Sequence, residues 1–318
     1  MFLCVVPVFL CSCVPVFLCF VCVEDPFTIK LNIGNRMNAL SFCTLTFGDQ
    51  AENHAGMQVL GELVSRGEGF SASDLLSYKS VFECLGARCE LIPLSLSVGV
   101  EAGVEVPESA FVLVIRGGVD AAIGAGGASA MFAENMSLDL DKKAWMRGRV
   151  VNKHARWNVC FDVDAQEPDY EAKKGRIVAY DTVPATNSFR EQLSILFGAK
   201  GANLKGEGNY YYDPSTCGIG FHGDSERRKV IGVRLAGPAC AMPPLHFHWF
   251  YRSEAVGARH VVELTAGDIY LMSEKSVGTD WRLSSRYTVR HATGASKFTS
   301  ILEKKSKNDV RKRARVVV

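Results

Sequence analysis

The sequence has almost no net charge, and its glycines do not form a nucleotide-binding signature. The 36 Lys and Arg residues nearly balance the 34 Asp and Glu residues, which leaves a formal charge of +2. This balance argues against a polycation that coats nucleic acid with its whole surface. The glycine-rich stretch "AIGAGGASAMF" (122–132) has neither the GxGxxG spacing nor the Lys-Ser/Thr ending of a phosphate-binding loop. We therefore expect a loop, or close packing of small residues, in that stretch.

The cysteines that follow residue 36 lack the CxxC spacing of a zinc or redox site. They are spread along the chain, so we interpret them as reduced and mostly buried thiols of an intracellular protein, either cytoplasmic or nuclear. These cysteines are Cys43, Cys84, Cys89, Cys160, Cys217 and Cys240.

The first 36 residues do not have a globular pattern. They contain no charged residue before Glu24, and "VPVFLC" occurs twice among them. The stretch is long enough to cross a bilayer, but it lacks the basic region and the cleavage site of a signal peptide, and its prolines disfavour a helix. One interpretation is translation from upstream of a true start at Met37, and the other is a membrane anchor over residues 1–23. We leave residues 1–36 out of the fold prediction.

The C-terminal residues 304–318 are basic. "KKSKNDVRKRAR" (304–315) carries seven Lys or Arg residues against one Asp. Such a run is typical of a solvated tail, and its functional interpretations are a nuclear import signal or a contact with nucleic acid.

The chain between these ends has two different patterns of predicted secondary structure. Residues 37–145 predict a smaller α/β domain of unknown role, with strands near 39–49, 89–98 and 109–123 and helices over 52–63 and 71–86, the latter capped by Ser71 or Ser73. Residues 146–303 contain a strand (175–184), a helix (185–201) and then short strands in series, which favours a jelly roll, or double-stranded β-helix, with supporting helices. The predicted fold class is α+β. The short strands are expected within 208–213, 218–224, 229–237, 245–253, 258–273 and 285–294.

The stretch "GIGFHGDSERRKVIGVRL" (218–235) contains the first chemical signal. His222 and Asp224 are two residues apart at the end of a predicted strand, so both side chains leave the same face. His291, on a later predicted strand, could supply a third ligand. Two histidines and one carboxylate on one side of a metal are the facial triad of non-haem Fe(II) oxygenases.

The surrounding segment "NYYYDPSTCGIGFHGDSERRKVIGVRLAG" (209–237) resembles the AlkB-like branch of the 2-oxoglutarate- and Fe(II)-dependent oxygenases. That branch has an Asn–x–Tyr strand, a strand that ends in His–x–Asp with an acidic residue two positions later, and a strand of the type "IASVSLG". The similarity covers roughly residues 180–300. Here the matching residues are Asn209, Tyr211 or Tyr212, His222, Asp224 and Glu226.

The resemblance implies an Fe(II) and 2-oxoglutarate dioxygenase that uses O2 to hydroxylate or demethylate a substrate, with nucleic acid carrying a modified base as the favoured class. It also implies cofactor contacts from Asn209 and Tyr212. Two alignments compete for the end of the barrel. In the first, His291 is the distal ligand and Lys297 binds the far carboxylate of 2-oxoglutarate. In the second, Arg286 and Arg290 bind that carboxylate, and the distal ligand is missing or replaced.

The remaining polar and aromatic residues have ordinary structural interpretations beside the functional ones. Histidines 54, 154, 246, 248 and 260 are interpreted as structural, lining or exposed groups, although His246 or His248 could join His222 and Asp224 in a cupin-type metal site. A further alternative is a non-catalytic barrel that has lost its iron. Glu226 and Arg227 could contact substrate or simply pair with each other, and the aromatic run 249–251 packs a core or flanks a flipped base.

Overall fold

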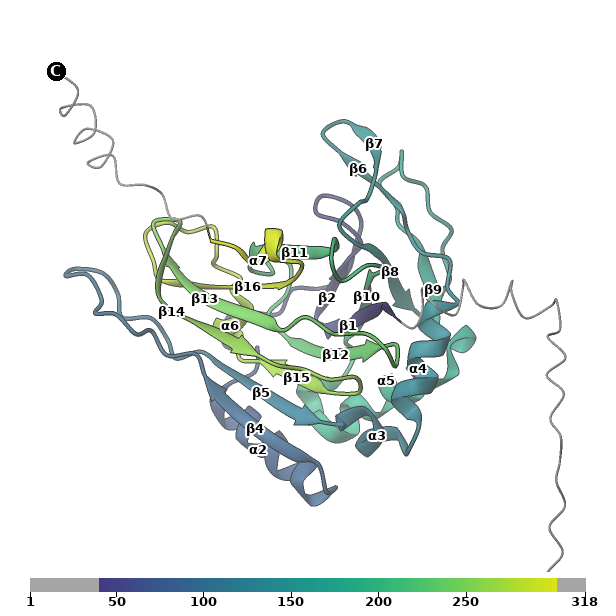
Figure 1. Ribbon diagram of the computed structural model, residues 1–318, viewed down its shortest axis with the longest axis horizontal. Coiled ribbons are helices and arrows are strands. Elements are labelled where there is room, and N and C mark those ends of the chain that lie inside the picture. The colour runs from purple at the N-terminus through teal and green to yellow at the C-terminus, as the bar shows by residue number, and fades with distance from the viewer. Residues whose placement is uncertain (1–39, 302–318) are drawn as a thin grey trace, which may run out of the picture.

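The computed structural model describes residues 40–301, which form two facing β-sheets with helices on the outer side of the larger one (Figure 1). The N-terminal segment 1–36 and the basic tail 304–318 lie outside the described residues. The predicted α+β class is confirmed, since strands and helices are both present.

The larger sheet has eight strands in the order β4-β5-β15-β12-β1-β10-β8-β9, and the smaller has four in the order β11-β16-β13-β14. Neighbours are antiparallel except β8 and β9, which are parallel. The strands of the larger sheet are β1 (Phe42–Gly48), β4 (Arg88–Pro93), β5 (Phe111–Arg116), β8 (Trp157–Asp162), β9 (Ile177–Ala179), β10 (Lys205–Tyr211), β12 (Val230–Ala236) and β15 (Ile269–Met272). Those of the smaller sheet are β11 (Gly218–His222), β13 (Leu245–Tyr251), β14 (Glu254–Val262) and β16 (Thr288–Gly294).

Two small hairpins and several helices complete the described residues. The hairpins pair β2 (Gln50–Glu52) with β3 (Val59–Gly61) and β6 (Lys143–Met146) with β7 (Arg149–Asn152). The helices are α2 (Ala72–Cys84), α3 (Gly118–Ile123), α4 (Gly127–Met136), α5 (Pro184–Phe197), α6 (Glu274–Val277) and α7 (Ser296–Thr299), with 3-10 turns at Tyr180–Thr182 and Gly198–Gly201. None of these helices combines the length and the apolar composition that crossing a membrane requires.

Strand β1 lies in the middle of the larger sheet, and its alternation separates the core from the cavity. Cys43, Leu45 and Phe47 belong to the apolar core shared with α2 and α5. The intervening Thr44 and Thr46 are on the opposite face and line a cavity between the sheets. The strand is therefore buried on both sides, with a dry face toward the helices and a polar face toward the site.

Most of the predicted elements are confirmed. Helix α2 begins with a capping box in which Ser71 and Asp74 exchange hydrogen bonds, and α5 begins with Pro184 in its first turn, where the missing N–H is not needed. The strand series from β10 to β16 is also confirmed. Two predictions are wrong: residues 52–63 contain the end of β2, a turn and β3 instead of a helix, and the expected strand 109–123 ends at Arg116, after which α3 begins. The glycine-rich stretch 122–132 contains the expected loop, between α3 and α4, and Gly127 packs closely against Ile123.

The predicted boundary at residue 145 does not separate two domains. Strands β1, β4 and β5, from the expected N-terminal α/β domain, pair with β10, β12 and β15 in one sheet. The two segments also share one apolar core. A strand that has both neighbours from the other segment cannot fold separately, because its backbone hydrogen bonds would be unmade.

Candidate metal centre

His222, Asp224 and His291 come together at one end of the smaller sheet. His222 is the last residue of β11, and the antiparallel pairing of β11 with β16 places it opposite His291. The chain then turns at Gly223, where a Cβ atom would lie 2.0 Å from the Gly278 carbonyl oxygen. Only glycine allows this close approach, which lets the Asp224 amide donate to the Val277 carbonyl at 3.1 Å.

The ligand atoms of this triad converge. The Nε2 atoms of His222 and His291 each lie 3.5 Å from Asp224 Oδ1, and one ligand atom from each of the three residues falls within 4.8 Å of the others. Within the described residues this is the one such group of three. Two imidazole nitrogens and one carboxylate oxygen leave further coordination positions free on the side that faces the cavity.

Backbone hydrogen bonds hold the His222 ring in the tautomer that a metal requires. Its Nδ1 lies 2.8 Å from the Gly220 carbonyl oxygen and 3.0 Å from the His291 carbonyl oxygen. Because carbonyl oxygens only accept, Nδ1 carries the proton, and Nε2 keeps its lone pair toward Asp224.

The surroundings of His222 and Asp224 keep both side chains in the ionisation state that suits a bound cation. Burial, assisted by neighbouring His291, lowers the pKa of His222 to about 3. Burial alone would raise the pKa of Asp224, but His291, Arg227 and His222 outweigh it and hold that pKa well below its usual range. Near neutral pH the site therefore has a neutral His222 and an ionised Asp224.

Arg227 holds the Asp224 carboxylate in position through the oxygen that does not face the histidines. Its guanidinium is almost fully buried, with Nη2 at 2.5 Å from Glu207 and 2.8 Å from Glu226, and Nε at 3.7 Å from Asp224 Oδ2. Asp224 thus presents Oδ1 to the histidines while Oδ2 faces a cation. The sequence alone did not decide whether Arg227 contacts substrate or pairs with Glu226. In the structure Arg227 pairs with Glu226 and also holds Asp224 in position.

We expect Arg227→Met to weaken metal binding by about 10- to 100-fold, as loss of an outer-shell partner does. The single change also leaves Glu207 buried without a counter-ion, at a cost of about 3–5 kcal/mol in the free energy of unfolding. The Arg227→Met, Glu207→Gln double variant removes both charges and should recover most of that stability while metal affinity stays low. Co(II) titration and denaturant unfolding measure the two quantities, with Arg228→Met as the neighbouring control. Wild-type affinity in the double variant would show that Arg227 only stabilises the fold.

The triad opens into a cavity of about 780 Å³ between the two sheets. Glu52 and Glu226 line one part of it, and burial raises the pKa of Glu52 to about 7. Arg234, from the centre of β12, lines the same cavity, as do Tyr211, Tyr270 and the threonines Thr44 and Thr293. The cavity therefore joins a potential metal site to a buried cation.

Arg234 is 1% exposed and has no carboxylate within ion-pair distance in the described part of the chain. Its Nη1 donates to Thr44 Oγ1 at 3.0 Å and its Nη2 to the Pro243 carbonyl at 2.6 Å, while Phe42 covers its plane at 4.7 Å. Its Nε is buried without a partner. A buried guanidinium without a counter-ion is costly, so the arrangement suits an anion that enters the cavity.

The predicted cofactor-binding cations are elsewhere. Arg290 adjoins His291 in β16 and so points to the opposite face, where it lies over Phe250 and donates to the Trp281 carbonyl. Lys297 is exposed on α7, and Arg286 pairs with Glu105 outside the cavity. None of the three lines the cavity that holds the triad, whereas Arg234 does.

The tyrosine assignment is corrected in the same way. Tyr212 donates its hydroxyl to the His154 carbonyl and stacks on Trp157, away from the cavity. Its neighbour Tyr211 is buried and lines the cavity. Asn209 does line it, although its amide already accepts from Arg156 and donates to Glu207.

The cupin-type ligand set does not form in the described residues. The His248 ring contacts the backbone carbonyl of Trp249, and neither His246 nor His248 belongs to the group of three. Of the other histidines, His54 lines the cavity and His260 contacts the Ser95 carbonyl.

Comparison with known proteins identifies a viral relative. No family model matches the chain. The chain is 43% identical over 255 residues to "Uncharacterized protein R156" of Acanthamoeba polyphaga mimivirus, an alignment that covers 80% of this chain and 96% of the viral protein. The chain belongs to the family of this mimivirus protein. The name of the viral protein states no activity, so the chemistry of this family must be argued from the site.

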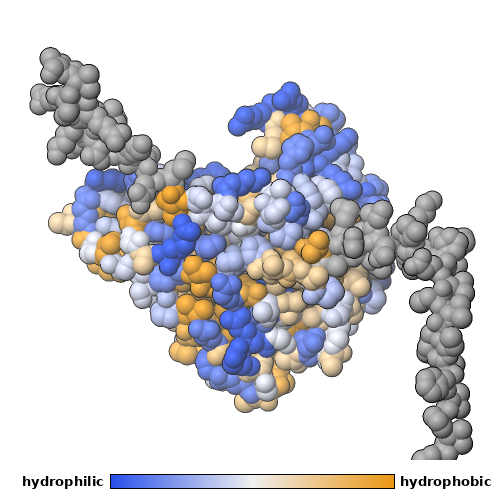
Figure 2. Space-filling model, in the orientation of Figure 1, coloured by the Kyte–Doolittle hydropathy of each residue, from blue (hydrophilic) through white to orange (hydrophobic). Residues whose placement is uncertain are grey.

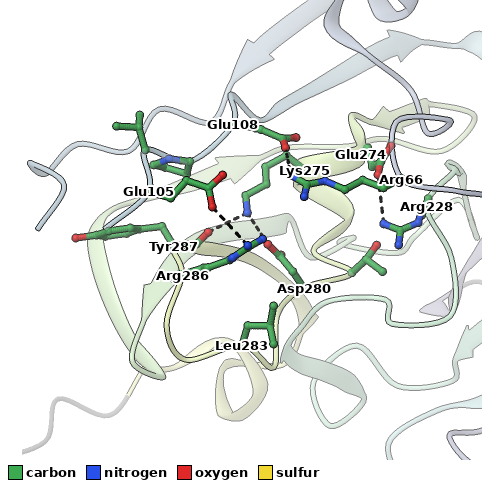
Figure 3. Close-up of a pocket in the computed structure, with 13 residues that line it drawn as sticks. Arg66, Glu105, Glu108, Arg228, Glu274, Lys275, Asp280, Leu283, Arg286 and Tyr287 are labelled. Carbon is green, nitrogen blue, oxygen red and sulfur yellow. Dashed lines mark hydrogen bonds and ion pairs between the residues drawn. The ribbon is translucent and has the colours of Figure 1, made fainter. Parts of the chain in front are cut away.

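A second pocket, of about 290 Å³, lies beside α6, and its charged side chains are paired with one another. Figure 3 shows its four cationic side chains, each directed at a carboxylate. Two of these ion pairs, through Asp280 and Arg286, hold the segment that follows α6. The same segment brings Trp281 to the cavity, where its Nε1 donates to Ser225. The pairs are Arg66–Glu108, Arg228–Glu274, Lys275–Asp280 and Arg286–Glu105.

Proposed function

We propose that the protein is an Fe(II)- and 2-oxoglutarate-dependent dioxygenase of the AlkB-like type. The observation that carries the proposal is the presence of the His222–Asp224–His291 triad and the unpaired, buried Arg234 in one cavity. The triad offers two imidazoles and a carboxylate on one side, which is the donor set of non-haem iron oxygenases. Arg234 offers a guanidinium with a free Nε to a dicarboxylate.

The arrangement of the strands supports the double-stranded β-helix that this proposal includes. From β10 to β16 successive strands alternate between the two sheets, except that β13 and β14 form a hairpin in the smaller one. Strand β1 completes the larger sheet between β10 and β12 and contributes Thr44 beside Arg234.

The residues fit the implied cofactors. His222, Asp224 and His291 would hold Fe(II), and Arg234 with the hydroxyl of Thr44 would hold the far carboxylate of 2-oxoglutarate. When bound, iron and 2-oxoglutarate supply the oxidation of a substrate C–H bond by O2, with one oxygen atom entering the substrate and the other entering the succinate formed by loss of CO2.

The chain's own part is positioning and exclusion of water. The carbonyls of Gly220 and His291 orient one imidazole, and Arg227 keeps the carboxylate in place. Tyr270 is buried near Arg234, and desolvation raises its pKa, so it remains a neutral hydrogen-bond donor. Phe221 and Trp281 line the same cavity and offer planar faces to a substrate such as a modified nucleobase.

Anaerobic titration of the wild-type protein with Fe(II) and then 2-oxoglutarate tests the proposal. We expect a metal-to-ligand charge-transfer absorption band only when both are present, and succinate once O2 is admitted. Metal binding without the band or succinate would instead indicate a jelly-roll metalloprotein that does not use 2-oxoglutarate. Absence of metal binding would indicate a non-catalytic barrel.

A further inference from the structure

The hairpin formed by β6 and β7 concentrates positive charge beside the cavity. Between residues 142 and 156 the chain has six Lys or Arg residues and no Asp or Glu, although the whole protein has a formal charge of only +2. Among the ion pairs of the described residues, none involves any of these six cations. They are Lys142, Lys143, Arg147, Arg149, Lys153 and Arg156.

The hairpin projects from the body of the molecule (Figure 1) and has a largely hydrophilic surface with a small apolar patch (Figure 2). Lys143, Arg147 and Arg149 are exposed along it. Cations on an exposed ribbon with no acidic neighbours repel one another in the free protein. A polyanion would relieve this repulsion.

The turn at the tip carries a side chain that its backbone does not favour. Arg147 and Gly148 have φ values of 52° and 80°, so both central residues of this two-residue turn are left-handed. Such turns favour Asn-Gly, because Asn tolerates this region better than a long side chain does. The chain thus presents an arginine at the outermost point, against the local preference.

The base of the hairpin is attached to the wall of the cavity. Asp141, just before β6, accepts a hydrogen bond from Asn53 at 2.6 Å, and Lys153, just after β7, lies 3.3 Å from Asn53 Oδ1. Asn53 lines the cavity that holds the triad, and so does Arg156, which follows β7. A chain held along the hairpin would therefore lead toward the proposed metal.

We propose that the β6–β7 hairpin binds the phosphate backbone of a nucleic-acid strand whose nucleotide enters the cavity. Regularly spaced phosphates complement a ribbon of unpaired cations, and phosphate contacts are what position a protein on nucleic acid. A membrane surface is disfavoured, because the two residues at the tip, Arg147 and Gly148, are not apolar. The role of this contact rests on the proposed function, but the contact itself does not.

Fluorescence anisotropy of a labelled single-stranded oligonucleotide, with the metal-free full-length protein, tests the contact. The Arg147→Glu, Arg149→Glu variant should bind at least about tenfold more weakly, and the slope of log affinity against log salt should fall by about 0.7 for each lost phosphate contact. Arg88→Glu, on the exposed edge strand at the other end of the larger sheet, is the control and should bind as the wild type does. Equal binding by the hairpin variant and the wild type overturns the proposal, as does equal weakening by Arg88→Glu.

Arg147→Asn separates binding from folding. Asn suits the left-handed turn, so the thermal midpoint should be unchanged or higher, while oligonucleotide affinity falls and the salt slope becomes smaller. Loss of affinity together with a lower midpoint would mean that the change acts through the fold, which overturns the assignment of Arg147.

The experiment also separates this proposal from the dioxygenase. The wild-type protein should bind the oligonucleotide equally well with and without Co(II), since the hairpin does not require the metal. If the hairpin variants weaken binding but the wild type forms no succinate, the surface stands and the enzymatic proposal fails. If anionic phosphatidylserine vesicles or polyglutamate compete as well as nucleic acid at equal charge, the partner class is wrong.

Discussion

His222→Ala protein is expected to lose metal binding by more than about 100-fold and to form no succinate. Outer-shell changes already cost 10- to 100-fold in affinity, and this one removes a ligand nitrogen. Only two donors would remain, and Asp224 would keep its charge in a buried setting with one imidazole fewer beside it. Co(II) titration by absorbance, followed by the Fe(II) and 2-oxoglutarate turnover assay, measures both losses.

His248→Ala is the matched control for this change. His248 is also a histidine of the smaller sheet, but its ring contacts a backbone carbonyl outside the triad. Both variants should lose folding stability through the cavity that the shorter side chain leaves. Only His222→Ala should lose the metal. Succinate formation by His222→Ala, or equal loss of metal in the two variants, contradicts the assignment of His222 as a ligand.

The triad could be predicted from the sequence because its spacing is local. His222 and Asp224 needed only the two-residue period of a strand to share a face. Predicting His291 required one further assumption, that a late strand pairs with the strand of His222. The pairing of β11 with β16 confirms this assumption. Neither inference depended on where the distant β1 lies.

Arg234 could not be assigned from the sequence, because its surroundings come from far along the chain. Its partner Thr44 is 190 residues away, on a strand that was expected in another domain. The resemblance directed attention to Arg286, Arg290 and Lys297, which are close to His291 in the sequence, whereas Arg234 lies on the earlier strand β12. One local signal was present, since "VIGVRLA" is an apolar strand with a single charge in its interior. Such a charge needs a buried partner or a ligand.

The tyrosine error has a similarly simple cause. Consecutive residues of a strand point to opposite faces, so assigning Tyr211 or Tyr212 to the cavity requires the exact register. That register is set by the pairing of β10 with β1, in which Tyr211 lies opposite Phe42 and stacks on it with ring centroids 4.3 Å apart. Spacing from His222 alone could not supply this information.

Arg234→Met is expected to abolish 2-oxoglutarate binding while leaving metal binding intact. Hydrogen bonds to a charged group contribute about 1.5–3 kcal/mol each, so loss of a two-bond contact should weaken 2-oxoglutarate by roughly 10²- to 10⁴-fold. Arg234→Lys keeps the charge but not the planar fork and should fall between the variant and the wild type. The charge-transfer band measures 2-oxoglutarate affinity, and Co(II) titration measures the metal.

Although Arg234→Met should weaken 2-oxoglutarate binding, it should not lower the free energy of unfolding. In the ligand-free protein Arg234 is a buried cation without a counter-ion, and burial lowers its pKa. Replacing such a charge by an apolar side chain of similar length is often neutral or stabilising by about 1–4 kcal/mol. Denaturant unfolding of the ligand-free protein should therefore show Arg234→Met to be at least as stable as the wild type. A residue whose role is only structural would show a loss instead.

Arg290→Met and Lys297→Met decide between the two locations of the carboxylate-binding cation. Arg290 packs on Phe250 on the far face of β16, and Lys297 is exposed, so both variants should bind 2-oxoglutarate like the wild type. If either variant binds 2-oxoglutarate weakly while Arg234→Met binds it normally, the carboxylate-binding cation is Arg290 of β16 or Lys297 of α7. Because a dicarboxylate that spans the cavity needs a cation at the end away from its metal, the affinities of these three variants locate that end by measurement.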